Sequence, residues 1–355
     1  VLMMHPSSLR FVLLLAVLVS FLQCVTATVN YAYCSEKYGN LTYIPEANMF
    51  EKYPPHLISF PGSGNAFVRL LIEYATGFYT GSMGTDDFEF LGEGGFIGER
   101  SCGLRLAALR AHPHYFDFLN GKLRFGHNFQ RDKCKRGLIR EMKRIIVLVR
   151  NPYDALWSYY QLLTSLSHKE YVTTATFDPA NWLYLAPIMA AYWNNEFYRI
   201  VKPIFDTFLP EDVTVVKYED LIDPNKREAA LQALLKFMQY TKVPDEKVTC
   251  AFLLADKPFV HRNPNDPHRV PAKTAFLVSA SQASSSSPAV SHTQPNGVAD
   301  ITHGLEMTHH KNLLCQMREH FTGMSKRFNY TLTPTSMGPT DICDVKLPPA
   351  GQVSV

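Results

Sequence analysis

The apolar run Ile-Ile-Val-Leu-Val at residues 145–149 limits the possible folds of this chain more than any other feature. Four of its five residues are β-branched, and a continuous apolar run is typical of a strand covered on both faces. Pro152 follows closely, at a position where the first turn of a helix tolerates proline, and a helix is expected to about Leu166. A buried strand that leads into a helix indicates an α/β fold with a parallel sheet.

Further segments repeat this alternation of short strands and helices. Strands are expected at 57–60, 123–126, 145–150 and 213–217, and helices at 65–75, 182–201, 228–238 and 307–327. We therefore predict a three-layer α/β sandwich, in which helices cover both faces of a central parallel sheet.

Composition excludes several classes of protein. The 355 residues are 46% apolar and 19% charged, which excludes disorder of the whole chain, and a net charge of +3 gives no sign of a nucleic-acid binder. A single long apolar run argues against a multi-span membrane protein.

The expected organisation is a signal peptide or signal anchor at 1–27, a lumenal lead-in at 28–56, a main domain at 57–278, a Ser-rich flexible insertion at 279–300, a helical part at 301–333 and an irregular tail at 334–355.

The N-terminal segment and the cysteines predict a lumenal protein. Arg10 precedes the apolar run 11–25, as in secretory signals, so we expect either secretion after cleavage or a single-pass type II membrane protein of the Golgi lumen. Asn40 and Asn329 begin glycosylation triplets. Six cysteines outside the apolar run favour disulfides over a metal site, with the connectivity left open: Cys34, Cys102, Cys134, Cys250, Cys315 and Cys343.

A glycine loop, FPGSGN at residues 60–65, separates the strand expected at 57–60 from the following helix. Such a loop presents backbone N–H groups at a helix N-terminus, where the helix dipole also favours negative charge. The glycines allow close approach of an anion. The pattern GxxxxGK[ST] is absent, so an ordinary ATP or GTP site, as in a nucleotide kinase, is disfavoured.

A second element strengthens the prediction of an anion site. Arg150 directly follows the strand at 145–149, at the edge of the sheet where open α/β folds bind ligands, and Ser158 lies in the next helix. An arginine and a hydroxyl that converge on one phosphate form a charge-assisted site. The alternative interpretation is an ion pair between Arg150 and Asp154 and an ordinary surface serine.

These two motifs, FPGSGN at 60–65 and VRNPYDALWSYY at 149–160, resemble the nucleotide-binding motifs of sulfotransferases that use 3'-phosphoadenosine 5'-phosphosulfate (PAPS). Residues 59–82 are similar to the first motif of the sulfotransferase domain in WSC-domain-containing proteins. The resemblance covers about residues 56–265 and includes no cysteine-rich WSC module. It implies a P-loop-like sulfotransferase fold.

The resemblance also implies roles for individual residues. Arg150 and Ser158 would bind the 3'-phosphate, Tyr218 would lie near the adenine, and Arg262 resembles a late basic contact. The residues implied to wrap the 5'-phosphosulfate, with an aromatic at the usual adenine-stacking position, are Gly62, Ser63, Gly64, Asn65, Ala66 and Phe67. Without the resemblance, Phe67 and Tyr218 would be interpreted as core aromatics.

The catalytic groups are less clearly marked. Many sulfotransferases carry a lysine where Gly62 stands here, so another cation must stabilise the leaving group. The candidates are Arg69, Arg131, Lys133 and Lys257, although Arg69 could instead form a surface pair with Glu73. His127 follows the strand expected at 123–126 and is the candidate general base, with Glu99 and Glu93 as alternatives.

The resemblance therefore implies a PAPS-dependent enzyme that releases 3'-phosphoadenosine 5'-phosphate (PAP). Its expected partner is a hydroxyl-bearing acceptor, in particular a glycan, with no nucleic acid, no metal and membrane contact only through the N-terminal segment. The alternative is a catalytically weak or inactive nucleotide-binding protein of the same fold. Acceptor loops vary, so the acceptor's identity stays open.

Overall fold

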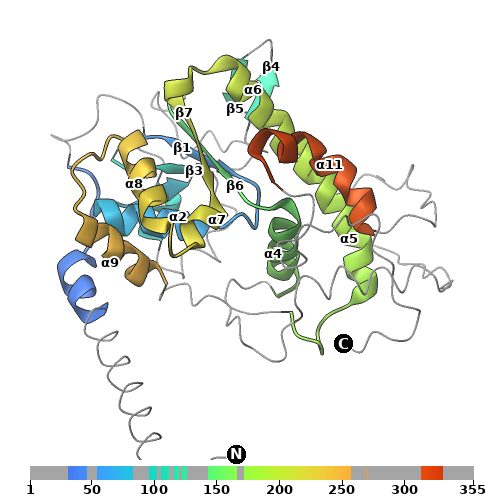
Figure 1. The fold of residues 1–355 in the computed structure, drawn as a ribbon, viewed down its shortest axis with the longest axis horizontal. Coiled ribbons are helices and arrows are strands. Elements are labelled where there is room, and N and C mark those ends of the chain that lie inside the picture. Colours follow the sequence, from blue (N-terminus) through green and yellow to red (C-terminus); the bar gives the residue numbers. More distant parts are fainter. Residues whose placement is uncertain are drawn as a thin grey trace, which may run out of the picture.

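A five-stranded sheet forms the centre of the computed structural model, and all of its pairings are parallel (Figure 1). Its strand order is β2-β3-β1-β6-β7. The strands are β1 (His56–Ser59), β2 (Gly81–Ser82), β3 (Leu109–Ala111), β6 (Ile145–Val149) and β7 (Val213–Lys217). The structure describes residues 31–45, 54–82, 96–101, 105–111, 116–119, 122–125, 143–165, 172–256, 270 and 313–330.

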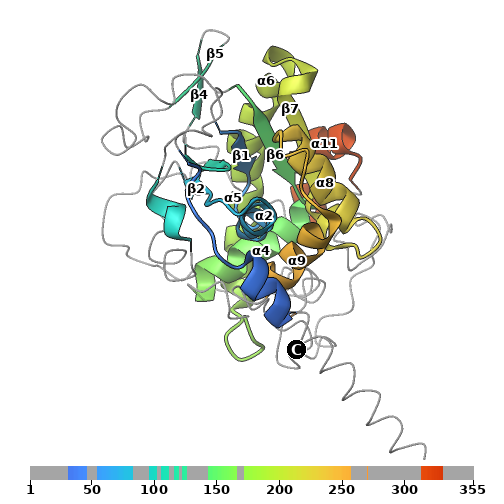
Figure 2. The same cartoon turned by 90° about the vertical axis from the view of Figure 1, so that its left-hand side faces the viewer.

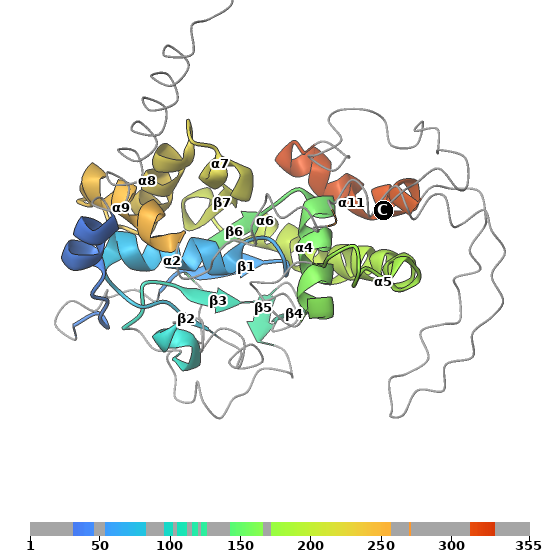
Figure 3. The ribbon, with the colours of Figure 1, turned by 90° about the horizontal axis from the view of Figure 1, so that it is seen from below.

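Helices lie on both faces of this sheet, as the run of short apolar strands predicts (Figure 3). One face carries α2 (Asn65–Thr76), α7 (Tyr218–Ile222), α8 (Arg227–Phe237) and α9 (Asp245–Ala255). The other carries α4 (Pro152–Ser165), α5 (Pro179–Tyr192), α6 (Arg199–Thr207) and α11 (Leu313–Phe328). Alternate residues of β6 serve the two cores: Ile146 and Leu148 pack toward α2, and Val147 and Val149 pack toward α4.

Most predicted helices are confirmed. The helix expected at 182–201 is longer at both ends, because α5 continues through a π-helical segment, Trp193–Tyr198, into α6. A 3₁₀ turn, η2 (Ile97–Arg100), precedes β3, and another, η5 (Pro210–Asp212), precedes β7. The strands β2 and β3 and the helix α9 were not predicted.

The strand expected at 123–126 does not belong to the central sheet. It is β5 (Lys122–Phe125), which pairs antiparallel with β4 (Phe116–Leu119) in a separate two-stranded sheet set apart from the central one (Figure 2). The sequence explains this correction. Asn120 and Gly121 form a dipeptide typical of hairpin turns, and β5 alternates charged and apolar residues instead of forming a continuous apolar run.

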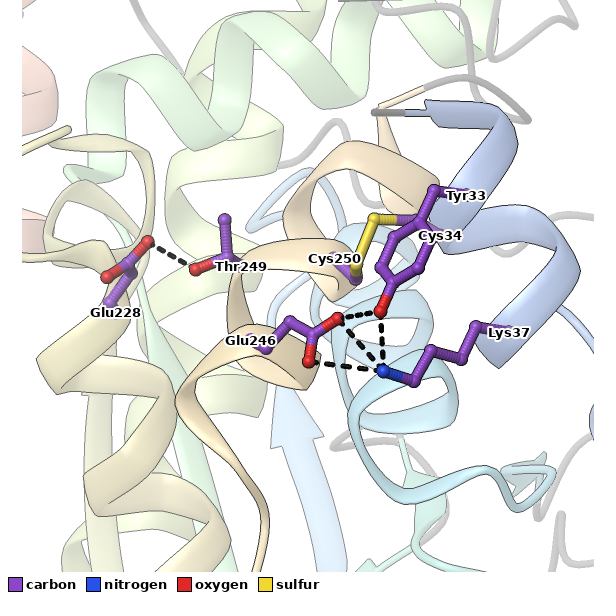
Figure 4. The surroundings of a disulfide bond; sticks show 7 residues. All are labelled: Tyr33, Cys34, Lys37, Glu228, Glu246, Thr249 and Cys250. Atoms are coloured by element: carbon purple, nitrogen blue, oxygen red, sulfur yellow. Dashed lines mark hydrogen bonds and ion pairs between the residues drawn. A yellow bond between two sulfur atoms is a disulfide. The ribbon is translucent and has the colours of Figure 1, made fainter. Parts of the chain in front are cut away.

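A disulfide joins Cys34 to Cys250, which confirms the prediction of at least one bridge. It ties the helical residues 31–38 to α9, and Cys34 and Cys250 are each 3% exposed. Beside it, Lys37 Nζ lies 3.1 Å from Glu246 Oε1, and the Tyr33 hydroxyl donates to the same carboxylate (Figure 4). The lead-in is therefore held to the helix that packs on α2.

Loss of this bridge should destabilise the fold. Replacement of Cys250 by alanine should lower the free energy of unfolding by about 2–4 kcal/mol, because the unfolded chain regains the freedom that the cross-link removes. Urea denaturation of the wild type, Cys34→Ala, Cys250→Ala and the double variant measures this effect. All three variants should lose the same amount. A further loss in the double variant would show that the two thiols act separately.

Within the described ranges, no helix is both long enough and apolar enough to cross a bilayer. The apolar run at 11–25, on which the prediction of a signal peptide or anchor depends, lies outside those ranges.

Candidate nucleotide site

The glycine loop and Arg150 lie at the point where the direction of the sheet connections changes. After β1 the chain passes through α2 to β2 and β3 on one side, and after β6 it passes through α4 to β7 on the other. β1 and β6 are adjacent and parallel, so the loop that follows β1 and Arg150 after β6 share the carboxyl edge of the sheet. Open α/β sheets bind ligands at such a switch point.

Two glycines give the loop its shape. Gly62 and Gly64 have φ values of 82° and 88°, a left-handed conformation that other residues rarely adopt. A Cβ on Gly62 would lie 2.2 Å from the Ala155 carbonyl oxygen of α4, and a Cβ on Gly64 would lie 2.3 Å from the Tyr218 ring. The loop therefore packs directly between α4 and Tyr218.

The loop leads into the N-terminus of α2, a helix of 12 residues. Its cap residue, Gly64, has no side chain to satisfy the first N–H groups. The backbone N–H groups of Gly64, Asn65 and Ala66 donate to no acceptor among the described residues. Ser63 is buried at 2% exposed, and Asn65 Nδ2 donates to Ser59 Oγ at 2.8 Å. The helix end thus offers donors and a positive dipole to an anion.

Arg150 is fixed in this site by the loop itself. Its Nη1 donates to the Gly62 carbonyl at 2.7 Å, and its guanidinium lies 4.5 Å from the centre of the Tyr218 ring. Among the described residues Arg150 forms no ion pair, so the alternative interpretation as a partner of Asp154 is wrong. A half-buried guanidinium with donors left over favours an anionic ligand.

The two aromatic candidates have different positions. Tyr218 is half-buried and lies between Gly64 and Arg150, at the edge of the site. Phe67 is 8% exposed and belongs to the core, where its ring centre lies 6.1 Å from that of Tyr218. Tyr218, not Phe67, is therefore the aromatic that contacts Arg150.

Ser158 lies in the turn of α4 on which the glycine loop packs. A Cβ on Gly62 would contact Ala155 and Tyr159 of that turn. Ser158 lies between these two residues in the sequence, and its side chain is half-buried. Its place in the fold is compatible with the proposed role beside the loop.

Arg69 is placed differently from what the sequence predicts. It is 0% exposed and pairs with Glu99, and its Nε donates to Thr80 Oγ1 at 2.9 Å. The predicted surface pair with Glu73 is therefore wrong. Glu99 is also 0% exposed and lies 2.8 Å from Arg110 Nη2. A fully buried cation and a carboxylate held by two arginines have structural roles, so we do not assign Arg69 as a catalyst or Glu99 as a base.

Glu73 gives this buried cluster a pH dependence. Burial raises the pKa of Glu73 from 4.5 to about 7, although the charge of Arg69 and hydrogen bonds from Thr80 lower it. Between those two values the folded protein binds a proton that the unfolded chain does not bind. The contribution of Glu73 to stability is therefore greatest at low pH and is lost as the pH rises through about 7.

Glu73→Gln should remove that dependence, because the amide oxygen can still accept from Thr80 while no proton is taken up. We subtract the free energy of unfolding of the variant from that of the wild type. This difference should fall by about 1–3 kcal/mol between pH 4.5 and pH 8. Urea denaturation across that range measures it. A constant difference would contradict the raised pKa.

The remaining candidates lie outside the described residues. These are the candidate base His127, the alternative base Glu93, the basic contact Arg262, and the candidate cations Arg131, Lys133 and Lys257. Their roles stay predictions. Within the described ranges, no group of three or more metal-binding side chains could hold an ion.

The structure adds polar residues that the sequence analysis did not single out. Lys217 ends β7, opposite Val149 in register, and its Nζ lies 5.2 Å from the ring centre of Tyr330. Glu219 accepts from the Asn151 backbone N–H and from the Tyr330 hydroxyl, both at 2.7 Å. The sequence signal was the position of Lys217 and Glu219 at the end of a predicted strand. No local signal could place Tyr330, which is 111 residues from Glu219.

Comparison with known proteins gives a distant similarity. No family model matches the chain. The chain is 25% identical over 207 residues to WSCD family member GA21586 of Drosophila pseudoobscura pseudoobscura, and this match covers 56% of the chain. The chain spans about half of the relative's length, 54%. The similarity points to a distant relationship with the WSCD family.

Proposed function

We propose that this chain is a sulfotransferase of the P-loop-like fold that moves a sulfuryl group from PAPS to a hydroxyl of a glycan. The observation that carries the proposal is Arg150, whose guanidinium has no carboxylate partner among the residues that the structure describes and is held against the glycine loop at the switch point of a parallel sheet. The distant similarity to a WSCD family member supports it.

In this proposal the two anionic ends of the nucleotide occupy different parts of the site. The N–H groups of Gly64, Asn65 and Ala66 would receive the 5'-phosphosulfate, because the helix dipole favours negative charge there. Arg150 and Ser158 would receive the 3'-phosphate, the group that distinguishes PAPS from ATP. The Tyr218 ring, which already packs on Arg150, would line the adenosine.

The reaction is an in-line displacement at sulfur. The acceptor oxygen forms a bond to sulfur, its proton passes to a base, and the bond between sulfur and the bridging oxygen breaks, which leaves PAP with the electron pair. His127 is the proposed base. Lys217 joins Arg131, Lys133 and Lys257 as a candidate cation for the leaving group, because it lies at the same edge of the sheet as Arg150.

Thermal unfolding of the wild type with PAP, ATP and AMP tests the nucleotide assignment. PAP at a concentration well above its dissociation constant should raise the melting temperature, whereas ATP and AMP should raise it much less. A larger shift with ATP would favour a nucleotide kinase. Turnover of sulfur-labelled PAPS on a panel of glycans then tests the activity, and transfer to no glycan would contradict it.

A second candidate function, a PAPS-binding protein with little or no turnover, has one specific observation in its favour. The position that carries a lysine in many sulfotransferases is Gly62, whose Cβ direction is blocked by the α4 backbone at 2.2 Å. No side chain fits there in this loop conformation. Strong PAP binding with no sulfuryl transfer across the panel would favour this function.

We further propose that the protein acts in the lumen of the secretory pathway, as a single-pass type II protein of the Golgi or in secreted form. The Cys34–Cys250 disulfide supports an oxidising compartment, and Asn40 and Asn329 of the two glycosylation triplets are exposed. Loss of mass after treatment with an N-glycosidase tests this placement. An unmodified protein from secretory cells would contradict glycosylation at either triplet.

A further inference from the structure

An acidic side chain lies close to the proposed phosphate site. Glu219 Oε1 accepts from the backbone N–H of Asn151, the residue that directly follows Arg150, at 2.7 Å. Glu219 also directly follows Tyr218, whose ring packs on the Arg150 guanidinium. A carboxylate bonded to the residue next to an arginine is a natural competitor for that arginine, because an ion pair between them would use the donors that a phosphate needs.

The structure shows that this pair does not form. Arg150 donates to the Gly62 carbonyl and forms no ion pair among the described residues. The Glu219 carboxylate is instead held on both oxygens, because the Tyr330 hydroxyl donates to Oε2 at 2.7 Å while Asn151 occupies Oε1. Tyr330 follows the C-terminal helix α11, so a segment far away in sequence fixes this side chain.

The Tyr330 side chain is fixed in position by its own contacts. Its side chain is half-buried and packs against the core on the α4 face, and Lys217 Nζ lies 5.2 Å from its ring centre. Burial, together with the neighbouring charge of Glu219, raises the pKa of the Tyr330 hydroxyl. The hydroxyl therefore keeps its proton and remains a donor at physiological pH.

We propose that Tyr330 is a positioning residue that holds the Glu219 carboxylate away from Arg150 and so keeps Arg150 available to the 3'-phosphate. This inference rests on the proposed function. It assigns to the segment that follows α11 a direct part in nucleotide selectivity.

Four proteins test the inference: the wild type, Tyr330→Phe, Glu219→Gln and the double variant. Phenylalanine removes only the hydroxyl, keeps the ring beside Lys217 and leaves the triplet at Asn329 intact. In Tyr330→Phe the Glu219 Oε2 atom loses its donor and should pair with Arg150, so the affinity for PAP should fall by roughly 5- to 20-fold. The affinity for AMP, which has no 3'-phosphate, should change by less than about twofold.

The double variant separates positioning from structural support. Glutamine carries no charge and cannot form an ion pair with Arg150, so Glu219→Gln should restore the PAP affinity of Tyr330→Phe to within about twofold of the wild type. If Tyr330 only supported the fold, the second substitution would restore nothing. Tyr43→Phe is the matched control, since its hydroxyl also contacts a side chain, Ser101 Oγ at 3.2 Å, but far from Arg150 in sequence. It should not change PAP affinity.

Isothermal titration with PAP and AMP gives both affinities, and thermal unfolding confirms that each variant is folded. A wild type that prefers PAP, a loss in Tyr330→Phe and recovery in the double variant would support the inference. A wild type with that preference but with an unaffected Tyr330→Phe, or with no recovery, would overturn the inference alone. A wild type that does not prefer PAP over AMP would overturn the proposed function and this inference with it.

Discussion

Replacement of Arg150 by alanine should weaken PAP binding by about 100-fold or more, the usual scale for loss of a buried charge-assisted contact. The binding of AMP should change by less than about threefold, because AMP lacks the phosphate that Arg150 is proposed to bind. The geometry gives a reason for the size of the effect. The guanidinium is half-buried, lies against Tyr218 and is already oriented by the Gly62 carbonyl, so little ordering is needed when an anion binds.

Arg144→Ala is the matched control for this prediction. Arg144 precedes β6 just as Arg150 follows it, so the two variants lose the same charge at opposite ends of one strand. The Arg144 guanidinium donates to the Phe237 carbonyl at 2.8 Å, which is a contact within the fold. Its loss should leave the ratio of PAP to AMP affinity unchanged. If Arg150→Ala weakens PAP and AMP equally, Arg150 has only a structural role.

Gly62→Ala should be the most damaging single change in the glycine loop. Its Cβ would lie 2.2 Å from a backbone oxygen of α4, and the residue would keep a φ of 82°. The left-handed conformation and the backbone overlap should together lower the free energy of unfolding by about 3–5 kcal/mol. PAP binding should be lost as well, because the loop must move away from α4 to relieve the contact.

Gly77→Ala separates the two contributions. Gly77 has a φ of 85° at the other end of α2, but the nearest atom to its Cβ would be the Nζ of Lys247, at 3.4 Å. It therefore shares the backbone strain without the overlap, and should cost only about 1–2 kcal/mol with PAP binding retained. Urea denaturation and PAP titration of both variants provide the measurement. Equal losses of stability would show that contact with α4 is not what requires glycine at position 62.

The parts of the fold that the sequence predicts well are those with strong local signals. Gly77 ends α2 in a left-handed conformation, and Pro152 begins α4, so both helices were placed within about two residues. The strand at 145–149 was placed correctly because it is a continuous apolar run. The strands β2 and β3 have two and three residues, which is too short for any periodicity to be detected.

Only those parts of the site that lie next to a recognisable strand were predicted from the sequence. The loop at 60–65 and Arg150 each follow a recognisable strand, and parallel pairing of β1 with β6 brings them together. The true partner of Arg69 was not predictable, because Glu99 lies 30 residues away and the helical period offers Glu73 first. The same reason explains why the sequence left the pairing of Cys34 open, since its partner is 216 residues away.

A crystal structure of the protein with PAP tests the central claim most directly. We predict that the 3'-phosphate lies within hydrogen-bonding distance of the Arg150 guanidinium and that the 5'-phosphate lies on the backbone N–H groups at the start of α2. Glu219 should remain bonded to Tyr330 in that complex. PAP bound elsewhere, or bound at the loop with its 3'-phosphate directed away from Arg150, would contradict the account.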